Sequence, residues 1–522
     1  MCVRRSALIA LMAMMLTGCA FAGRNTASQT QNATFYSMED EAVISYEVPT
    51  GYPHIIVDQL GYAPDSKKLA FMFGSVIPEE FTLVDANTGK QVFNAKVTDK
   101  GFYEEYGSNV GMADFTKYDL KGEYYIEADH LGRSYSFSIK DDLYGEIFNE
   151  SCRKYYYNRC GITLTEDLAG ENAHNACHTQ NALLRQDMTI QKDVSGGWHQ
   201  DSTGSKDIIT ASGTLGTMLM AYELFPAAFA DDTGIPESGN GIPDILDEAR
   251  FEVEWFLKMQ DETTGSVYSG ITVTPNERNS SFIIYVEPAD IESSRAFAFA
   301  VAKFGYLFQN YDRDFATVCL QAADRAFKYS VLNDDTEGTF TPYKLASACE
   351  IYRASGSAQC QGYINVYFQS EPDLTDIDDV TLMGLCTYLS TKMSVNQDYC
   401  RTAINAIMKE AEEISAELRS YAFLMPESQD LGDNSTIFHD MMVMTIVDHI
   451  ITNNEYDNII ENFMHYFLGR NKMSVSFIDD AGEYSYKQIH ESLGIMKQFD
   501  SNSKLIFMLA KVISRDGFVK EQ

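Results

Sequence analysis

The sequence predicts a multidomain protein in which a small β domain precedes a larger all-α domain. Between Ile55 and about Ile139, short apolar runs alternate with turn residues, which is typical of antiparallel strands. After Asp142, apolar residues recur at helical spacing for most of the chain. The length of 522 residues is enough for two or three domains. Regularly spaced strands favour a β-sandwich, and paired helices favour an α/α toroid, with a helical bundle or solenoid as the alternative.

The composition is that of an ordinary globular protein, with 45% hydrophobic and 22% charged residues. The formal net charge of -35 argues against a nucleic-acid partner, because a phosphate backbone requires Lys and Arg to displace its counterions. An acidic surface suits an exported protein with neutral substrates such as glycans, although many soluble proteins share it.

Residues 1–19 are predicted to be an export signal. Arg4 and Arg5 precede a short apolar run, Ala7 to Leu16, that is too short to span a bilayer as a helix. The run ends in Leu-Thr-Gly-Cys, which resembles the bacterial lipoprotein cleavage box. That resemblance implies lipidation of Cys19 and a membrane-anchored protein on the bacterial cell surface; an ordinary cleaved signal is the alternative. Residues 20–53 lack apolar periodicity and are predicted to be a flexible tether.

The β domain is predicted to occupy residues 54–140. Its expected strands share β-branched and aromatic residues, and they are 55–57, 69–73, 81–84, 124–126 and 135–139. Polar and glycine-containing stretches at 85–89 and 120–122 are expected to form turns between them.

The helical domain is predicted to occupy residues 141–518. Its clearest helix is 244–260, where Leu246, Val253 and Phe256 lie on one apolar stripe while Glu248 and Glu252 are expected to face away. The other expected helices are 211–224, 294–311, 315–332, 345–355, 381–393, 398–419, 435–451, 456–468 and 502–514.

Several motifs resemble glycoside hydrolase family 9, and they appear in the order of that family. They are Val-Asp-Gln-Leu-Gly-Tyr-Ala-Pro at 57–64, Gly-Gly-Trp at 196–198, the segments 239–250 and 254–260, Cys-Glu-Ile-Tyr-Arg-Ala-Ser-Gly at 349–356, and His-Tyr-Phe-Leu-Gly-Arg-Asn at 465–471. The resemblance implies an (α/α)6 barrel preceded by an immunoglobulin-like module. It also implies hydrolysis of β-1,4-glucosidic bonds in cellulose-like glucans.

Cys160, Cys177, His178 and His199 form a predicted zinc site. Two thiolates and two imidazoles suit the tetrahedral preference of zinc and leave no open position, so the metal is expected to be structural. The alternative is that the cysteines are bridged or free and the histidines lie at the surface. Calcium is a further possible cofactor, with carboxylates at 231, 232, 244, 247 and 248 as its expected ligands; helix N-terminal charge explains most of these equally well.

Inverting hydrolysis requires a carboxylate base and a carboxylic acid roughly 6.5–9.5 Å apart. The resemblance places the family's two aspartates at Gln200 and Thr203 and its acid at Met496, none of which can exchange a proton near neutral pH. The nearest carboxylates are Asp201 and Glu491. The predicted substrate contacts are His490 and Trp198.

The sequence therefore predicts a surface lipoprotein of the family 9 type that has lost its chemistry and acts in binding or assembly of a β-glucan or related plant polysaccharide. The alternative is an active inverting endo-β-1,4-glucanase that uses Asp201 and Glu491. A third hypothesis is a protein–protein module that uses the barrel as its scaffold.

Overall fold

The computed structural model describes residues 53–104, 106–276, 282–334, 340–425, 434–451, 454–479 and 481–515. The predicted signal, its Cys19, the predicted tether up to residue 52 and the predicted domain end at residue 518 lie outside the described residues. No described helix combines the length and the apolarity that a membrane crossing requires.

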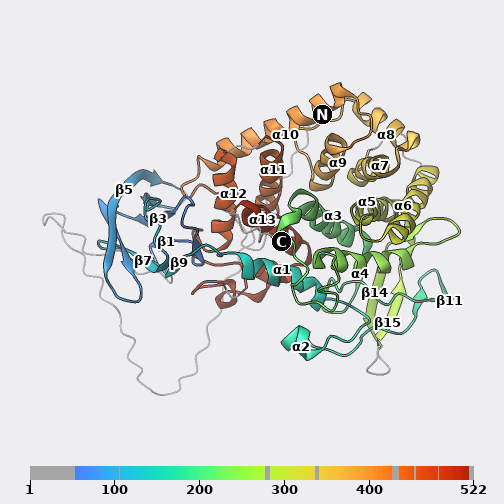
Figure 1. The fold of residues 1–522 in the computed structure, drawn as a ribbon, viewed down its shortest axis with the longest axis horizontal. Coiled ribbons are helices and arrows are strands. Elements are labelled where there is room, and N and C mark those ends of the chain that lie inside the picture. Colours follow the sequence, from blue (N-terminus) through green and yellow to red (C-terminus); the bar gives the residue numbers. More distant parts are fainter. Residues whose placement is uncertain are drawn as a thin grey trace, which may run out of the picture. The chain divides into compact units, whose positions relative to one another are not determined.

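The N-terminal domain is rich in β-structure (Figure 1). Its strands are β1 (Ile55–Ile56), β2 (Gly61–Tyr62), β3 (Leu69–Gly74), β4 (Glu80–Asp85), β5 (Gln91–Tyr103), β6 (Ser108–Asp114), β7 (Gly122–Ala128), β8 (Gly132–Arg133) and β9 (Phe137–Ile139). Hydrogen bonding follows the order β1-β3-β6-β5-β4-β7-β9-β2, with β8 beside β7. The pairs are antiparallel apart from the parallel pair of β2 and β9.

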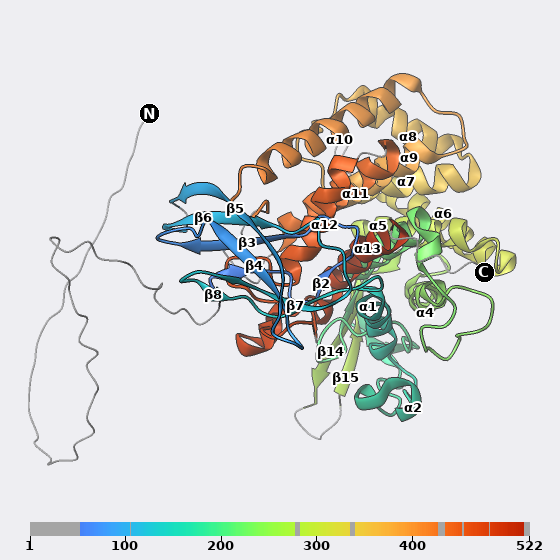
Figure 2. The same cartoon turned by 60° about the vertical axis from the view of Figure 1, so that its left-hand side comes forward.

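The five strands expected from the sequence correspond to β1, β3, β4, β7 and β9. Strands β5 and β6 were not expected from the sequence; β6 pairs with β3, and β5 pairs with β6 (Figure 2). No residue of β5 is fully buried, and its apolar alternation is confined to Phe93, Ala95 and Val97, so its signal is shorter and weaker than that of a core strand. Its backbone pairs with β4 through residues 91–96 and with β6 through residues 97–103, and these partners keep it extended.

The C-terminal domain is mainly helical (Figure 1). Its helices are α1 (Gly145–Tyr157), α2 (Glu166–Ala169), α3 (Ile208–Leu224), α4 (Asp244–Met259), α5 (Ile291–Phe308), α6 (Arg313–Asn333), α7 (Pro342–Ser355), α8 (Ala358–Gln369), α9 (Asp379–Ser390), α10 (Gln397–Leu418), α11 (Ser435–Ile451), α12 (Asn454–Phe467) and α13 (Phe499–Arg515). All ten helices expected from the sequence are present, whereas α1, α2 and α8 were not expected.

The helices divide into two groups by burial and contact. α3, α5, α7, α9 and α11 are buried along much of their surface, whereas α6 and α10 bury one face. The odd-numbered helices from α3 to α13 contact one another in sequence order, and α13 contacts α3, which closes a ring. One hydrophobic core joins buried side chains of these helices to those of the other helices, such as α4, α6 and α10.

Several helices begin about one turn earlier than their apolar pattern indicates, because an aspartate caps them. Asp207 accepts a hydrogen bond from the backbone of Thr210 at the start of α3, and Asp290 and Asp378 act in the same way on α5 and α9. Such a cap satisfies a backbone N–H that has no partner within the helix.

The expectation of an all-α second domain was wrong in one respect. A five-stranded sheet lies among the helices, with the order β11-β10-β15-β14-β12, and a second sheet pairs β13 (Val267–Tyr268) with β16 (Ala289–Asp290). The strands of the larger sheet are β10 (Ala182–Leu184), β11 (Asp187–Lys192), β12 (Lys206–Asp207), β14 (Gly270–Pro275) and β15 (Phe282–Val286). Two of the pairings, β10 with β15 and β12 with β14, join segments that are far apart in the sequence, so local patterns alone do not predict these sheets.

A buried polar contact joins the β-rich domain to the helical domain. The Nδ1 atom of His465 donates to Oδ2 of Asp58 at 2.7 Å, and both residues are almost completely buried. The side chain of Gln59 also donates to the backbone oxygen of Ser474 at 2.6 Å. The motif that begins with Val57 therefore reaches across to α12 and the loop that follows it.

Candidate metal centre and substrate site

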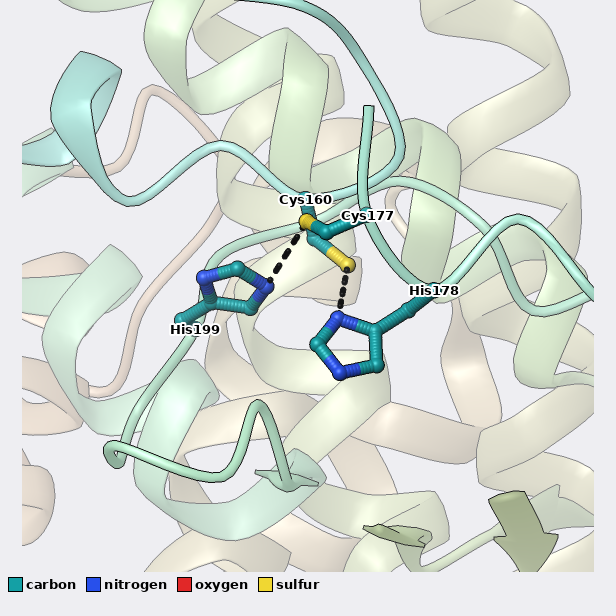
Figure 3. Close-up of side chains that lie close together, drawn as sticks. All are labelled: Cys160, Cys177, His178 and His199. Atoms are coloured by element: carbon teal, nitrogen blue, oxygen red, sulfur yellow. Dashed lines mark hydrogen bonds between the residues drawn. The ribbon is translucent and has the colours of Figure 1, made fainter. Parts of the chain in front are cut away.

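Four side chains predicted to bind zinc converge in the structure (Figure 3). One ligand atom from each of Cys160, Cys177, His178 and His199 lies within 4.8 Å of the others. The Sγ atom of Cys177 is 3.4 Å from Nε2 of His199, and that of Cys160 is 3.8 Å from Nδ1 of His178. A tetrahedral zinc with its usual bond lengths places ligand atoms roughly 3.3–3.8 Å apart. The set therefore fits a zinc ion, and neither cysteine forms a disulfide.

Backbone pairing after α1 brings two of these ligands together. The N–H of Cys160 donates to the carbonyl of Gly197, and the N–H of His199 donates to the carbonyl of Asn158, each at 2.8 Å. Gly204 then places the following loop against the site. Its φ of +85° is in the left-handed region, and a Cβ atom at this position would lie 2.5 Å from the ring of His178.

The two thiols also interact electrostatically. The hydrogen bond between Cys160 and Cys177 lowers the pKa of Cys177, and further hydrogen bonds from His178 and His199 act in the same direction. One sulfur of the pair therefore already favours the thiolate form, which is the form that binds a metal.

The glycine-rich segment next to the metal site rests on buried carboxylates of α4. The backbone N–H of Trp198 donates to Glu252 at 2.6 Å, and its indole N–H donates to Glu248 at 3.1 Å. The expectation that these glutamates face away from the core was wrong, because they are 0% and 2% exposed. Burial raises the pKa of Glu252 to about 8, although the nearby Lys206 opposes the shift. Trp198 itself is 0% exposed, so its ring has no open face for a sugar in this structure.

Two of the carboxylates considered for calcium, Asp231 and Asp244, accept hydrogen bonds within their own loop. Oδ2 of Asp244 accepts from the backbone N–H and hydroxyl of Thr233 and from the hydroxyl of Ser238. Asp231 accepts from the backbone of Gly239 and Gly241.

The loop that contains Gln200, Asp201 and Thr203 is held in place by hydrogen bonds of its polar side chains. The amide of Gln200 accepts from the backbone N–H of Asp207 and donates to its carbonyl, both at 2.9 Å. Asp201 is exposed and accepts from the backbone N–H groups of Thr203 and Ser205 and from the Thr203 hydroxyl. Although partial desolvation opposes them, these hydrogen bonds hold the pKa of Asp201 below its usual value.

The predicted acid lies in a short exposed segment before α13. Glu491 is exposed and forms an ion pair with Lys497, which lowers its pKa. His490 beside it is also exposed, whereas Met496 is packed into the hydrophobic core. Asp201 and Glu491 are therefore each engaged by their own loop, and each has a depressed pKa.

Four carboxylates near the N-terminal ends of the ring helices act on one tyrosine, and the sequence did not predict that they lie near each other. Burial is the largest cause that raises the pKa of Tyr343, and the next largest are the negative charges of Asp500, Glu292, Asp207 and Asp378. The hydroxyl of Tyr343 donates to the carbonyl of Ile209 at 3.1 Å. The four carboxylates belong to different helices, so only the tertiary structure brings them together.

The fold and the site define the class of this protein. The profile of glycosyl hydrolase family 9 matches residues 144–507, and that of the cellulase N-terminal Ig-like domain matches residues 50–133. The chain belongs to glycosyl hydrolase family 9 and carries the Ig-like domain of cellulases.

Individual relatives are distant but cover most of the chain. A cellodextrinase from Butyrivibrio fibrisolvens is 26% identical over 490 residues, covering 84% of this chain and 86% of that protein. Endoglucanase D from Acetivibrio thermocellus is 24% identical over 471 residues, covering 82% and 73%. The crystal structure of a metagenome-derived family 9 endoglucanase superposes with a TM-score of 0.78 at 22% identity, covering 87% of this chain and 98% of that one.

Proposed function

We propose that this protein is an exported member of family 9 that binds β-glucan and has lost the family's hydrolytic chemistry. Its relatives include a cellodextrinase and endoglucanases, which supports a β-1,4-glucan as the ligand. The observation that carries the loss of chemistry is the residue set at the reacting positions. The resemblance places Gln200, Thr203 and Met496 at these positions, and none of them is a proton donor or acceptor near neutral pH.

The local environments support the same proposal. A general acid requires a raised pKa so that it is protonated when the substrate binds, and Glu491 has a lowered one. Gln200 is used to hold the start of α3, and Met496 fills the core beneath α13. Both positions therefore have structural roles in this chain.

The competing proposal is an active inverting endoglucanase in which Asp201 is the base and Glu491 the acid. A reducing-sugar assay on a soluble β-glucan separates the two, with Asp201→Asn and Glu491→Gln as variants. We expect no activity above background in the parent protein. Activity that both substitutions abolish would refute the degenerate proposal, because removing one member of a working pair typically costs 10²–10⁴ in rate.

We further propose the domain bounds, the barrel fold, the zinc ion and the lipid anchor that the resemblance implies. The domains are 54–140 and 141–518, and the second is an (α/α)6 barrel, which the closed ring of odd-numbered helices supports. The four-ligand set holds a structural zinc; a family 9 endoglucanase is known as a Zn-binding triple mutant. Lipidation of Cys19 would anchor the protein at the cell surface, and palmitate labelling of the parent and of Cys19→Ser tests this.

A further inference from the structure

A cavity of about 330 Å³ lies between α9 and three of the helices that α9 contacts, α3, α10 and α11 (Figure 1). The residues that line it on α3, α9 and α11 belong to the last two turns of these helices. Asp207 caps the opposite end of α3, and a helix of 17 residues is roughly 25 Å long at about 1.5 Å per residue. Because Gln200 is hydrogen-bonded to Asp207, the cavity is remote from the loop that resembles the family's catalytic segment.

Apolar side chains form most of the cavity lining, and they are Met220, Leu224, Leu389, Ile404, Ile446 and Ile450. Met220 and Cys386 also bring sulfur atoms to the lining, and sulfur makes favourable contacts with aromatic rings. The imidazole of His449 lines the cavity too and packs edge-on against Phe225, with ring centroids 5.7 Å apart. A sugar would lose hydrogen bonds to water against such a lining, so an aromatic ligand is favoured over a sugar.

The carboxylate in the lining, that of Glu223, is neutralised by a buried network. Lys303 donates to Glu223 at 2.6 Å and to Glu350 at 3.2 Å, and Arg353 pairs with the same two glutamates. Burial opposes ionisation of Glu223, but the two cations lower its pKa. The two positive and two negative charges cancel. A charged ligand would therefore lose its hydration without gaining an unpaired counter-charge from Glu223, and a neutral ligand is favoured.

Two neutral polar side chains give the cavity its hydrogen-bonding capacity. Partial burial and the charge of Lys511 lower the pKa of His449, so its imidazole is neutral near pH 7 and offers one N–H donor and one nitrogen acceptor. Within the part of the chain that the structure describes, neither ring nitrogen of His449 is hydrogen-bonded to another residue. The hydroxyl of Thr387 donates to Glu350 at 2.7 Å, so its oxygen is still an acceptor. The lining can therefore bind one hydroxyl group.

The cavity volume sets the size of the ligand. An apolar cavity of about 150 Å³ accepts one benzene molecule, and this cavity of about 330 Å³ has room for roughly two fused rings. We infer that the cavity binds a small, neutral, flat aromatic molecule that carries a hydroxyl group, which His449 recognises. The site is separate from glucan binding, so the inference goes beyond the proposed function and does not depend on it. Binding should stabilise the ring helices, because the ligand fills apolar volume between them.

Equilibrium dialysis of the full chain with 2-naphthol and with naphthalene tests the inference. Ile450→Trp places a larger side chain at the entrance, because Ile450 lines the cavity and is 43% exposed. Ile451→Trp is the matched control, because Ile451 is equally exposed on the same helix but does not line the cavity. His449→Phe keeps an aromatic ring and removes both nitrogens. A thermal melt of each variant checks that it is folded.

We expect the parent to bind 2-naphthol, Ile450→Trp to weaken this binding about tenfold, and Ile451→Trp to change it by less than about twofold. His449→Phe should weaken binding of 2-naphthol about fivefold and that of naphthalene by less than about twofold, because only 2-naphthol has a hydroxyl group.

No saturable binding by the parent, or equal binding by the parent and Ile450→Trp, would overturn the cavity site. Equal losses of both probes in His449→Phe would overturn recognition of the hydroxyl by His449. Displacement of 2-naphthol by cellohexaose would place the probe in the glucan site and refute the inference while the proposed function stands. If 2-naphthol binds with the expected pattern and cellohexaose does not bind, the inference stands and the proposed function fails.

Discussion

Replacing Asp58 with alanine tests how the β-rich domain is held on the helical domain. The carboxylate of Asp58 accepts from the backbone N–H of Leu60 at 2.8 Å, from that of Gly61 at 2.9 Å and from Nδ1 of His465 at 2.7 Å. All three donors lose their partner in Asp58→Ala. Each orphaned buried donor costs about 1–3 kcal/mol, so we expect the free energy of unfolding to fall by about 3–9 kcal/mol. That is a large fraction of the stability of an ordinary domain.

Urea denaturation followed by fluorescence measures this loss, and limited proteolysis reports whether the two domains separate. Asp58→Asn keeps one acceptor oxygen, and burial already raises the pKa of Asp58 well above its usual range, so the amide should cost less than half as much. Asp114→Ala is the control, because Asp114 is exposed and accepts one bond from Thr116 within its own turn. A loss below about 1 kcal/mol for Asp58→Ala, or an equal loss for Asp58→Asn, would refute the reasoning.

Three further predictions concern the helical domain. A chelator that removes zinc should lower the melting temperature of the parent but not that of Cys177→Ser, because loss of one ligand already weakens zinc binding. Equal changes in melting temperature for both proteins, with no metal detected by elemental analysis, would contradict the zinc site. Gly204→Ala should destabilise the protein by about 1–3 kcal/mol and weaken metal binding, because the new Cβ collides with the ring of His178; unchanged binding in a metal titration would argue against this contact. Although burial opposes protonation, two carboxylate partners raise the pKa of His439 to about 10. The stabilising effect of protonated His439 should be complete below pH 6.5 and be lost as the pH rises through 10. In urea denaturation at a series of pH values, His439→Gln should therefore flatten this part of the curve of unfolding free energy against pH. Parallel curves for parent and variant would contradict the prediction.

The sequence predicted the ordered parts of the fold because their signals are local. Helices such as α4 and α10 carry an apolar stripe within one segment, and strands such as β3 and β4 carry a short apolar run within six residues. The candidate metal ligands were also predictable, because two cysteines and two histidines together are a typical zinc ligand set. The structure brings all four side chains into one cluster that could hold a metal ion.

The sequence could not reveal which charged residues are buried. Glu248 and Glu252 have a helical spacing that suits either a solvated face or a buried one, and only their contacts with Trp198 decide between them. The role of Gln200 was equally hidden, since its two hydrogen bonds to Asp207 close a loop of seven residues. Side-chain type does not specify such partners.

By itself, the sequence determined the order of the two domains and the family, and its resemblance to that family predicts that Gln200, Thr203 and Met496 occupy the catalytic positions. The tertiary structure alone decided where the remaining carboxylates lie and that Asp201 and Glu491 are each held by their own loop. The physical reason is that periodicity and residue chemistry act over a few residues, whereas burial, pKa and cavity shape depend on atoms contributed by segments far apart in the chain.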